Sequence, residues 1–389
     1  SSQSAGPKIL WLKDNEPDNF RKVYKVMTST SYLVFRLTGR VVMDYYTAPF
    51  YDPFFNIHTK TWNRDLASRY FDPSILPDVA WTTDISGTVT EQAAAETGLK
   101  PGTPVITGTV DAAAEAVSVG VVEAGQTMVM YGTTFFVIQL VDQLKTSEDL
   151  WSSYFCIEGK PILAAGMSTS SALTRWFRDN FAATERMIQE QGGADAYSLL
   201  TQAAAKVEPG SDGLVVLPYF SGERTPVNDP HARGMILGLT LRHSAGHVFR
   251  SLLEGAAYSL RHNFDAMEAL GAKPAEITAV GGGTKSRLWL QIVSDVTGVK
   301  QVVPELTIGA SYGDAYLAGV GTGIFRDYST LLQQWIKIKE VIEPNPANKE
   351  VYDYLYEIYR ISYPLLKDSM KRLAVLQRGE GIWKPSSKS

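Results

Sequence analysis

Near residue 280 the sequence holds a short apolar run, three consecutive glycines and an amphipathic segment in direct succession. Residues 277–280 predict a strand, residues 281–283 a turn, and residues 284–297 a helix. Glycines let backbone N–H groups approach a ligand closely, and a helix N-terminus favours anions. The segment therefore predicts a strand-to-helix unit that either binds a phosphate or nucleotide or is a tight turn without a ligand.

Two common nucleotide-binding patterns do not describe this loop. Thr284 stands where the P-loop pattern requires a glycine before Lys285 and Ser286. In the dinucleotide pattern G-x-G-x-x-G, Ser286 occupies the last glycine position. A nucleotide loop of another type and a purely structural turn both stay open at this point.

Strand-like and helix-like segments alternate along the rest of the chain. Apolar or β-rich runs predict strands at residues 104–107, 126–131, 135–141 and 214–220. Residues 244–270 carry apolar side chains at spacings of three and four, which predicts a long helix. A last helical stretch, interrupted at Pro364, runs towards residue 376. This alternation indicates the α/β fold class.

Two further segments carry candidate functional residues. Gly132, Thr133 and Thr134 form a turn between two strands, and they either bind phosphate oxygens or are a simple turn. Asp111 follows the predicted strand 104–107, and open α/β sheets bind ligands at the carboxyl ends of their strands. Its carboxylate could take a proton from a substrate hydroxyl. It could also cap the helix that begins at Ala112, and the two roles are compatible.

Other candidate sites have simpler interpretations. Glu223 and Arg224 are expected to form a salt-bridged loop rather than a substrate contact. His243 and His247 have the i, i+4 spacing of a metal pair, but no third ligand or catalytic glutamate accompanies them. Cys156, the single cysteine, is expected to be a buried small apolar residue and excludes an intrachain disulfide framework.

The composition is that of a globular protein. Hydrophobic residues make up 44% of the 389 residues and charged residues 20%, which excludes a disordered or fibrous chain. The formal net charge is −4 and no polybasic block occurs, so nucleic acid and anionic membranes are not expected as partners. No apolar run reaches membrane-spanning length and the first residues lack a signal-peptide pattern, so a cytoplasmic protein is expected.

Taken together, these segments resemble the FGGY family of carbohydrate kinases from Lys8 to about Phe325. Residues 8–15 (KILWLKDN) are similar to the core of the family's first signature. The second signature is matched by residues 234–239 (GMILGL), His247-Val248 and residues 251–254 (SLLE). Gly108-Thr109-Val110-Asp111 is similar to the segment that carries the catalytic base. Residues 130–134 resemble the second phosphate loop, residues 281–286 resemble the adenosine loop, and residues 218–234 look closest to xylulokinases.

The resemblance implies an actin-like (ribonuclease H-like) ATPase fold, with two domains around a cleft for ATP and sugar. Asp111 would then be the catalytic base, Gly132, Thr133 and Thr134 would hold phosphates, and Gly282, Gly283 and Ser286 would line the adenosine pocket. Mg²⁺ would offset phosphate charge, with its protein ligands unknown, and a homodimer is possible. D-xylulose is the expected acceptor. Alternatives are gluconate, glycerol or another polyol, or a non-catalytic actin-like protein that only binds nucleotide.

The sequence departs from the family pattern in two places. Ser171 stands where the family usually has a glycine near the nucleotide phosphates. No segment matches the family's D-x-G-T phosphate and Mg²⁺ loop or its upstream sugar-binding segment. We therefore expect residues 1–123 to be the C-terminal part of an incomplete N-terminal domain, and residues 124–389 to form the C-terminal domain.

Overall fold

A seven-stranded mixed sheet forms the centre of the molecule in a computed structural model that describes residues 4–378. Its strands, in spatial order, are β15 (Ile338–Ile342), β14 (Lys300–Pro304), β13 (Glu276–Val280), β7 (Gln126–Tyr131), β8 (Phe135–Leu140), β10 (Pro161–Gly166) and β9 (Trp151–Tyr154). The hairpin β7–β8 is antiparallel, whereas β7, β13 and β14 run parallel. The predicted α/β class is confirmed.

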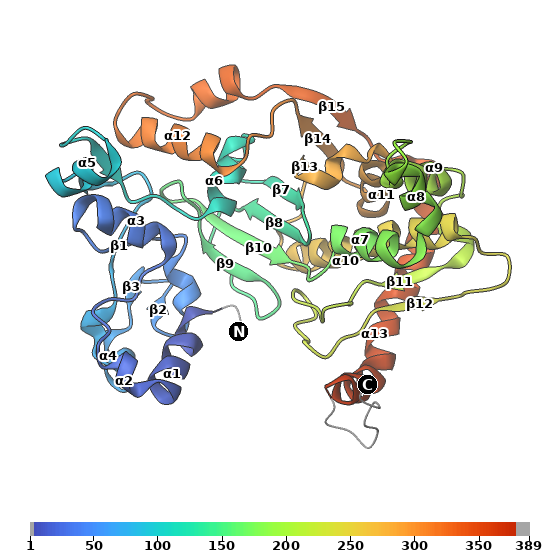
Figure 1. Cartoon of the computed structure of the whole chain (residues 1–389), viewed down its shortest axis with the longest axis horizontal. Coiled ribbons are helices and arrows are strands. Elements are labelled where there is room, and N and C mark those ends of the chain that lie inside the picture. Colours follow the sequence, from blue (N-terminus) through green and yellow to red (C-terminus); the bar gives the residue numbers. More distant parts are fainter. Residues whose placement is uncertain (1–3, 379–389) are drawn as a thin grey trace.

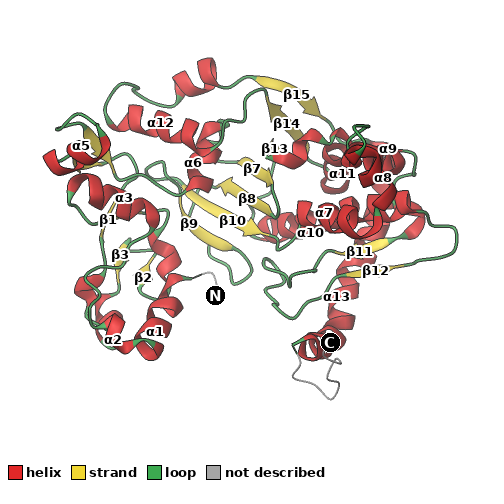
Figure 2. Cartoon of the chain, in the orientation of Figure 1, coloured by secondary structure: helices red, strands yellow, loops and turns green. Residues whose placement is uncertain are grey.

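Helices cover both faces of this sheet (Figures 1 and 2). Side chains alternate along each strand, so Val129 and Val137 join one buried cluster while Met128 and Ile138 join the other. The helices of the first cluster are α7 (Ser171–Phe181), α9 (Ala196–Ala205), α10 (Ala245–Ala269), α11 (Arg287–Thr297) and α13 (Lys349–Gln377). Those of the second are α6 (Asp111–Ser118) and α12 (Ala310–Gly321). The sheet is therefore the middle layer of three.

The first hundred residues form a smaller region beside the β9 edge, drawn in blue in Figure 1. Its helices are α1 (Ala5–Asn15), α2 (Pro17–Phe20), α3 (Ser29–Thr38), α4 (Arg64–Ser68) and α5 (Glu91–Thr97). Its strands pair two by two: β1 (Val42–Asp44) with β4 (Asp78–Ala80), β2 (Phe55–Asn56) with β3 (Thr61–Trp62), and β5 (Ile85–Thr88) with β6 (Pro104–Ile106). A third, aromatic-rich cluster that includes Phe54, Phe71 and Trp62 holds this region together. The remaining elements, α8 (Ala183–Glu190), β11 (Val215–Leu217) and β12 (Met235–Leu237), lie towards the opposite side.

Three details differ from the sequence-based expectations. The last helix, α13, continues through Pro364 instead of being interrupted there. A proline within a helix removes one N–H donor, but the turns around Pro364 pack against the core through Tyr363 and Leu366. Strand β6 pairs with β5 alone and its side chains are exposed or half-buried. Helix α11 begins at Arg287 because residues 282–285 form a separate 3₁₀ turn.

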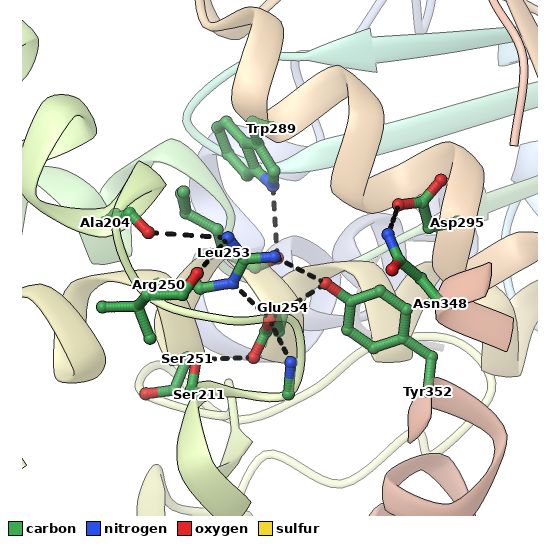
Figure 3. Close-up of polar contacts among 12 residues, drawn as sticks. Ala204, Ser211, Arg250, Ser251, Leu253, Glu254, Trp289, Asp295, Asn348 and Tyr352 are labelled. Carbon is green, nitrogen blue, oxygen red and sulfur yellow. Dashed lines mark hydrogen bonds and ion pairs between the residues drawn. The ribbon is translucent and has the colours of Figure 1, made fainter. Parts of the chain in front are cut away.

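A buried polar network joins α10 to α13 and to the turn before β11 (Figure 3). The Arg250 guanidinium donates to Glu254 Oε1 at 2.8 Å and to the Tyr352 hydroxyl at 3.0 Å. Glu254 also accepts from the Gly210 amide at 3.0 Å and the Ser211 hydroxyl at 2.7 Å. Because this buried carboxylate has a cation and several donors, the network fixes the relative position of three segments.

Candidate functional site

Two glycine-containing loops meet at one edge of the central sheet. Strands β7 and β13 are parallel neighbours, and Met130 is paired with Val280, so both strands end at the same edge. Gly281 has φ +91°, and a Cβ atom there would lie 2.9 Å from the Tyr131 carbonyl oxygen. A Cβ at Gly283 would lie 2.9 Å from Tyr131 Cβ. Glycine at these two positions therefore lets the loops lie side by side.

Gly282 and Ser286, which were also predicted for the adenosine pocket, do not lie against Tyr131 in this way. Gly282 is exposed, and a Cβ there would meet no atom within 4 Å. The Ser286 hydroxyl accepts the Trp289 amide at 3.3 Å and so caps α11. The sharp turn is therefore made at Gly281, while Gly282 leaves open space beside the loop.

The Gly132–Thr134 turn rests on the N-terminus of α7. The Ser170 amide donates to the Thr133 carbonyl at 3.0 Å, and the Ser171 amide donates to the Gly132 carbonyl at 3.2 Å. First-turn amides of a helix have no intrahelical partner, and here the turn's carbonyls supply one. The turn and α7 therefore form one rigid unit, and Ser171 replaces the expected glycine without interrupting it.

Asp111 is the first residue of α6, and its exposed carboxylate accepts the Ala112 amide at 2.8 Å. The preceding loop is anchored by Thr109, whose hydroxyl donates to Asp44 Oδ2 at 2.6 Å. Burial raises the pKa of Asp44, although the Thr109 hydrogen bond opposes this shift. The expected N-cap role is wrong, because α6 already begins at Asp111 and Val110 holds the N-cap position. The carboxylate of Asp111 instead accepts an amide of the first helical turn and stays open to solvent.

Helix α12 packs tightly on α6 next to Asp111. A Cβ at Gly313 would lie 1.9 Å from the Ala114 carbonyl oxygen, so the two backbones are in direct contact. Asp314 and Glu115 lie near Asp111, and burial first and the Asp111 charge second raise the pKa of both. A carboxylate-rich face therefore surrounds the predicted catalytic base.

A cavity of about 1010 Å³ lies between the N-terminal region and the larger one. One wall consists of residues from the segments 4 and 49–57, and the other of residues from 146–152, 168 and 221–230. Ser152 contributes a buried hydroxyl without a hydrogen-bond partner in the described part of the chain. Asp111, Gly132 and Gly282 are not among the lining residues.

The cavity is nonetheless structurally connected to Asp111. Phe50 and Trp151 line it, and both also pack against the buried cluster below α6. Val110 and Ala112, the neighbours of Asp111 in the chain, pack against that same cluster. One hydrophobic cluster thus supports both the cavity wall and the loop that carries Asp111.

Glu223 belongs to this cavity and was not predicted as a site residue. Its Oε1 accepts the Ser168 amide at 2.7 Å and the Arg224 amide at 2.8 Å, and its Oε2 accepts the Ser259 hydroxyl at 3.3 Å. Burial raises the pKa of Glu223 to about 7, although these hydrogen bonds oppose the shift. The expected salt bridge to Arg224 is wrong, because backbone and hydroxyl donors occupy the carboxylate.

In the structure His243 closes the turn before α10, and His247 belongs to the capping box of that helix. His243 Nδ1 accepts the Thr240 amide at 2.9 Å, and His247 Nδ1 accepts the Ser244 amide at 3.2 Å at the start of α10. Residues 4–378 contain no group of three or more His, Cys, Asp or Glu side chains arranged to hold a metal ion. Over the same range, no helix is both long and apolar enough to cross a membrane.

Comparison with known proteins gives these features a context. Residues 1–118 match the family model for the N-terminal domain of the FGGY carbohydrate kinases, and residues 127–322 match the model for the C-terminal domain. The chain is 32% identical over 374 residues to an autoinducer-2 kinase of Enterobacter sp. (strain 638), covering 92% of this chain and 69% of that protein. It is 30% identical over 370 residues to a xylulose kinase of Staphylococcus epidermidis, covering 93% of this chain and 71% of that protein.

A solved structure supports the same family assignment as the family models and the two relatives. The xylulose kinase of Rhodospirillum rubrum superimposes with a TM-score of 0.84 at 30% identity, covering 95% of this chain and 73% of that one. The expected two-domain, actin-like ATPase fold is thereby confirmed. The matched family models, these relatives and the shared fold agree, and the chain belongs to the FGGY family of carbohydrate kinases.

Proposed function

We propose that this sugar kinase transfers the γ-phosphoryl group of ATP to a primary hydroxyl of D-xylulose. The observation that carries the proposal is the meeting of two glycine loops at the carboxyl ends of β7 and β13. At such an edge, glycines let backbone N–H groups approach a ligand closely, which suits a nucleotide. The FGGY family uses ATP as phosphate donor, and xylulose kinases are among the similar proteins.

In this proposal Gly132, Thr133 and Thr134 hold the ATP phosphates, and Gly282, Gly283 and Ser286 line the adenosine pocket. The Asp111 carboxylate accepts the proton of the sugar hydroxyl as that oxygen bonds to the γ-phosphorus. The bond from the γ-phosphorus to the β,γ-bridging oxygen breaks, and ADP leaves with that oxygen. The solvent-facing carboxylate of Asp111, at the start of α6, suits an acceptor that arrives from outside.

Mg²⁺ remains part of the proposal as the partner of ATP. The described residues supply no cluster of three ligand side chains, so we assign the ion no protein ligands and derive no step through it. Magnesium in kinases commonly binds substrate phosphates and water with few carboxylates. Homodimer formation likewise stays a prediction.

Autoinducer-2 is a second candidate acceptor, because a protein named as its kinase is 32% identical to this chain. Gluconate, glycerol and other polyols remain alternatives within the family. Family membership favours phosphoryl transfer over the non-catalytic nucleotide-binding alternative.

The proposal is tested by measuring ADP formation with D-xylulose, autoinducer-2, gluconate and glycerol at equal concentrations. We expect the highest kcat/KM with D-xylulose. A higher value with another acceptor would replace D-xylulose in the proposal. Failure to bind ATP in a calorimetric titration would contradict the assignment of the glycine loops.

A further inference from the structure

The segment between β10 and α7, residues 167–170, connects the Gly132–Thr134 turn with the loop 218–226. On the side of the turn, the Met167 amide donates to the Phe135 carbonyl at 3.0 Å, and the Ser170 amide donates to the Thr133 carbonyl at 3.0 Å. The position of this connecting segment therefore determines where the predicted phosphate-binding turn lies.

On its other side the connecting segment is held by the loop 218–226. The Ser168 amide donates to Glu223 Oε1 at 2.7 Å, and the Thr169 hydroxyl donates to the Pro218 carbonyl. Just before the segment, the Gly166 amide donates to the Thr225 hydroxyl at 2.9 Å. Glu223 supplies the carboxyl group of this set, and it is 4% exposed. Hydrogen bonds from backbone amides to a carboxylate are stronger than those to neutral acceptors.

We propose that Glu223 is a positioning residue for ATP: its Oε1 fixes Ser168, and through the connecting segment it fixes the Gly132–Thr134 turn. This inference rests on the proposed function, since it assumes that the turn holds the ATP phosphates. Glu223 also lines the interdomain cavity, so it joins that cavity to the phosphate-binding edge of the sheet.

The geometry separates this role from a merely structural one. Both amide donors, those of Ser168 and Arg224, point to the same oxygen, Oε1. A glutamine can keep both bonds through its amide oxygen and donate its NH₂ to the Ser259 hydroxyl, whereas an alanine keeps none. The Tyr219 and Tyr359 hydroxyls lie nearby but bond to each other at 2.8 Å, so they cannot readily replace the carboxylate.

The experiment compares ATP dissociation constants of the whole chain by calorimetry for the wild type, Glu223→Gln and Glu223→Ala. We expect Glu223→Ala to bind ATP about tenfold or more weakly, because the hydrogen bond that holds Ser168 of the connecting segment is lost. Glu223→Gln should restore binding to within about threefold of the wild type, because the Oε1 acceptor is retained.

Glu254→Gln is the matched control, because Glu254 is also a buried carboxylate but bonds the Gly210 turn and α13 instead. Its unfolding temperature should fall while the ATP dissociation constant stays within about twofold, as for distant independent sites. Equal ATP affinities of the wild type and a folded Glu223→Ala would overturn the inference, and so would an equal loss in the glutamine variant. Absence of ATP binding by the wild type would instead overturn the proposed function.

Discussion

At the scale of single residues, Asp111 has an observed contact in α6 and a proposed chemical role. Its carboxylate accepts the Ala112 amide and yet stays exposed at the start of α6. An asparagine can keep the hydrogen bond from the Ala112 amide through its side-chain oxygen but cannot take a proton at neutral pH. Substitution therefore separates this local contact from the proposed proton transfer.

We expect Asp111→Asn to lower kcat for sugar phosphorylation by about 10²–10⁴, the usual contribution of a general base. The unfolding temperature and the ATP dissociation constant should stay close to those of the wild type. Steady-state kinetics at saturating sugar, with calorimetry as the control, test this. Near-normal turnover would remove Asp111 from the proposed mechanism.

Glu223 should give the folded state a recognisable pH dependence. Its pKa is raised from 4.5 to about 7, so the folded protein binds this proton more tightly than the unfolded chain does. The resulting stabilisation is complete below about pH 4.5 and is lost as the pH rises through 7, a change of roughly 3 kcal/mol. Urea unfolding between pH 5 and 8 should show that Glu223→Gln flattens this slope relative to the wild type.

These two residues also show what could be inferred from the sequence alone. The sequence indicates Asp111 as a candidate, because a strand-like run and a helix start bracket it, and its role stays a prediction. The contacts of Glu223 were not predicted, because adjacent acidic and basic residues favour a salt bridge. Its actual partners, the Ser168 amide and the Ser259 hydroxyl, are distant in sequence, and such pairing follows only from tertiary packing.

At the scale of elements, the glycine loop after β13 contains two kinds of glycine. Gly281 and Gly283 lie against Tyr131 at the end of β7, whereas Gly282 faces open space. The three residues are therefore not equivalent, although the sequence presents them as a uniform run. The same loop thus offers both a disruptive substitution and its control.

Gly283→Ala should lower the unfolding temperature, because the new methyl group would lie 2.9 Å from Tyr131 Cβ and 3.0 Å from the Trp289 ring. Overpacking of this kind costs about 1–3 kcal/mol. Gly282→Ala should leave the unfolding temperature unchanged and weaken ATP binding, since its added methyl group enters the space beside the loop. Thermal melts and ATP titrations of both variants check this. A stable Gly283→Ala protein, or unchanged ATP affinity in Gly282→Ala, would contradict it.

Elements with strong periodicity were predictable, and those that depend on neighbours were not. The strands β7 and β8 lie where β-rich runs predict them. The long helix α10 lies where apolar residues spaced three and four apart predict a helix. The proline in α13 and the exposed strand β6 were misjudged, because local pattern does not reveal which neighbours pack against an element. Of the candidate site, the loops could be located from the sequence, but not their contact through Tyr131.

At the scale of the whole molecule, the cavity is lined by residues of both the smaller N-terminal region and the larger region. Phe50 comes from one wall and Trp151 from the other. Kinases of this type commonly exclude water by moving such parts together when both substrates are bound.

We expect a non-hydrolysable ATP analogue together with sugar to reduce acrylamide quenching of Trp151, because closure shields the cavity walls from solvent. Comparing wild type with Trp151→Phe isolates this contribution from those of the other tryptophans. Unchanged quenching in the presence of both ligands would mean that the walls do not approach each other.

The order of strands in the central sheet has a consequence for biosynthesis. β7 and β13 are neighbours, and the next strand, β14, supplies Gln301, which accepts a hydrogen bond from the Tyr131 hydroxyl at 2.5 Å across 170 positions of sequence. A ribosome adding about 5–20 residues per second needs on the order of ten seconds to make that interval. Until β13 emerges, one edge of β7 stays unpaired and exposed to other chains. The edge proposed to bind nucleotide is therefore completed late in synthesis, and a nascent chain that stops before β13 should not be retained on immobilised ATP.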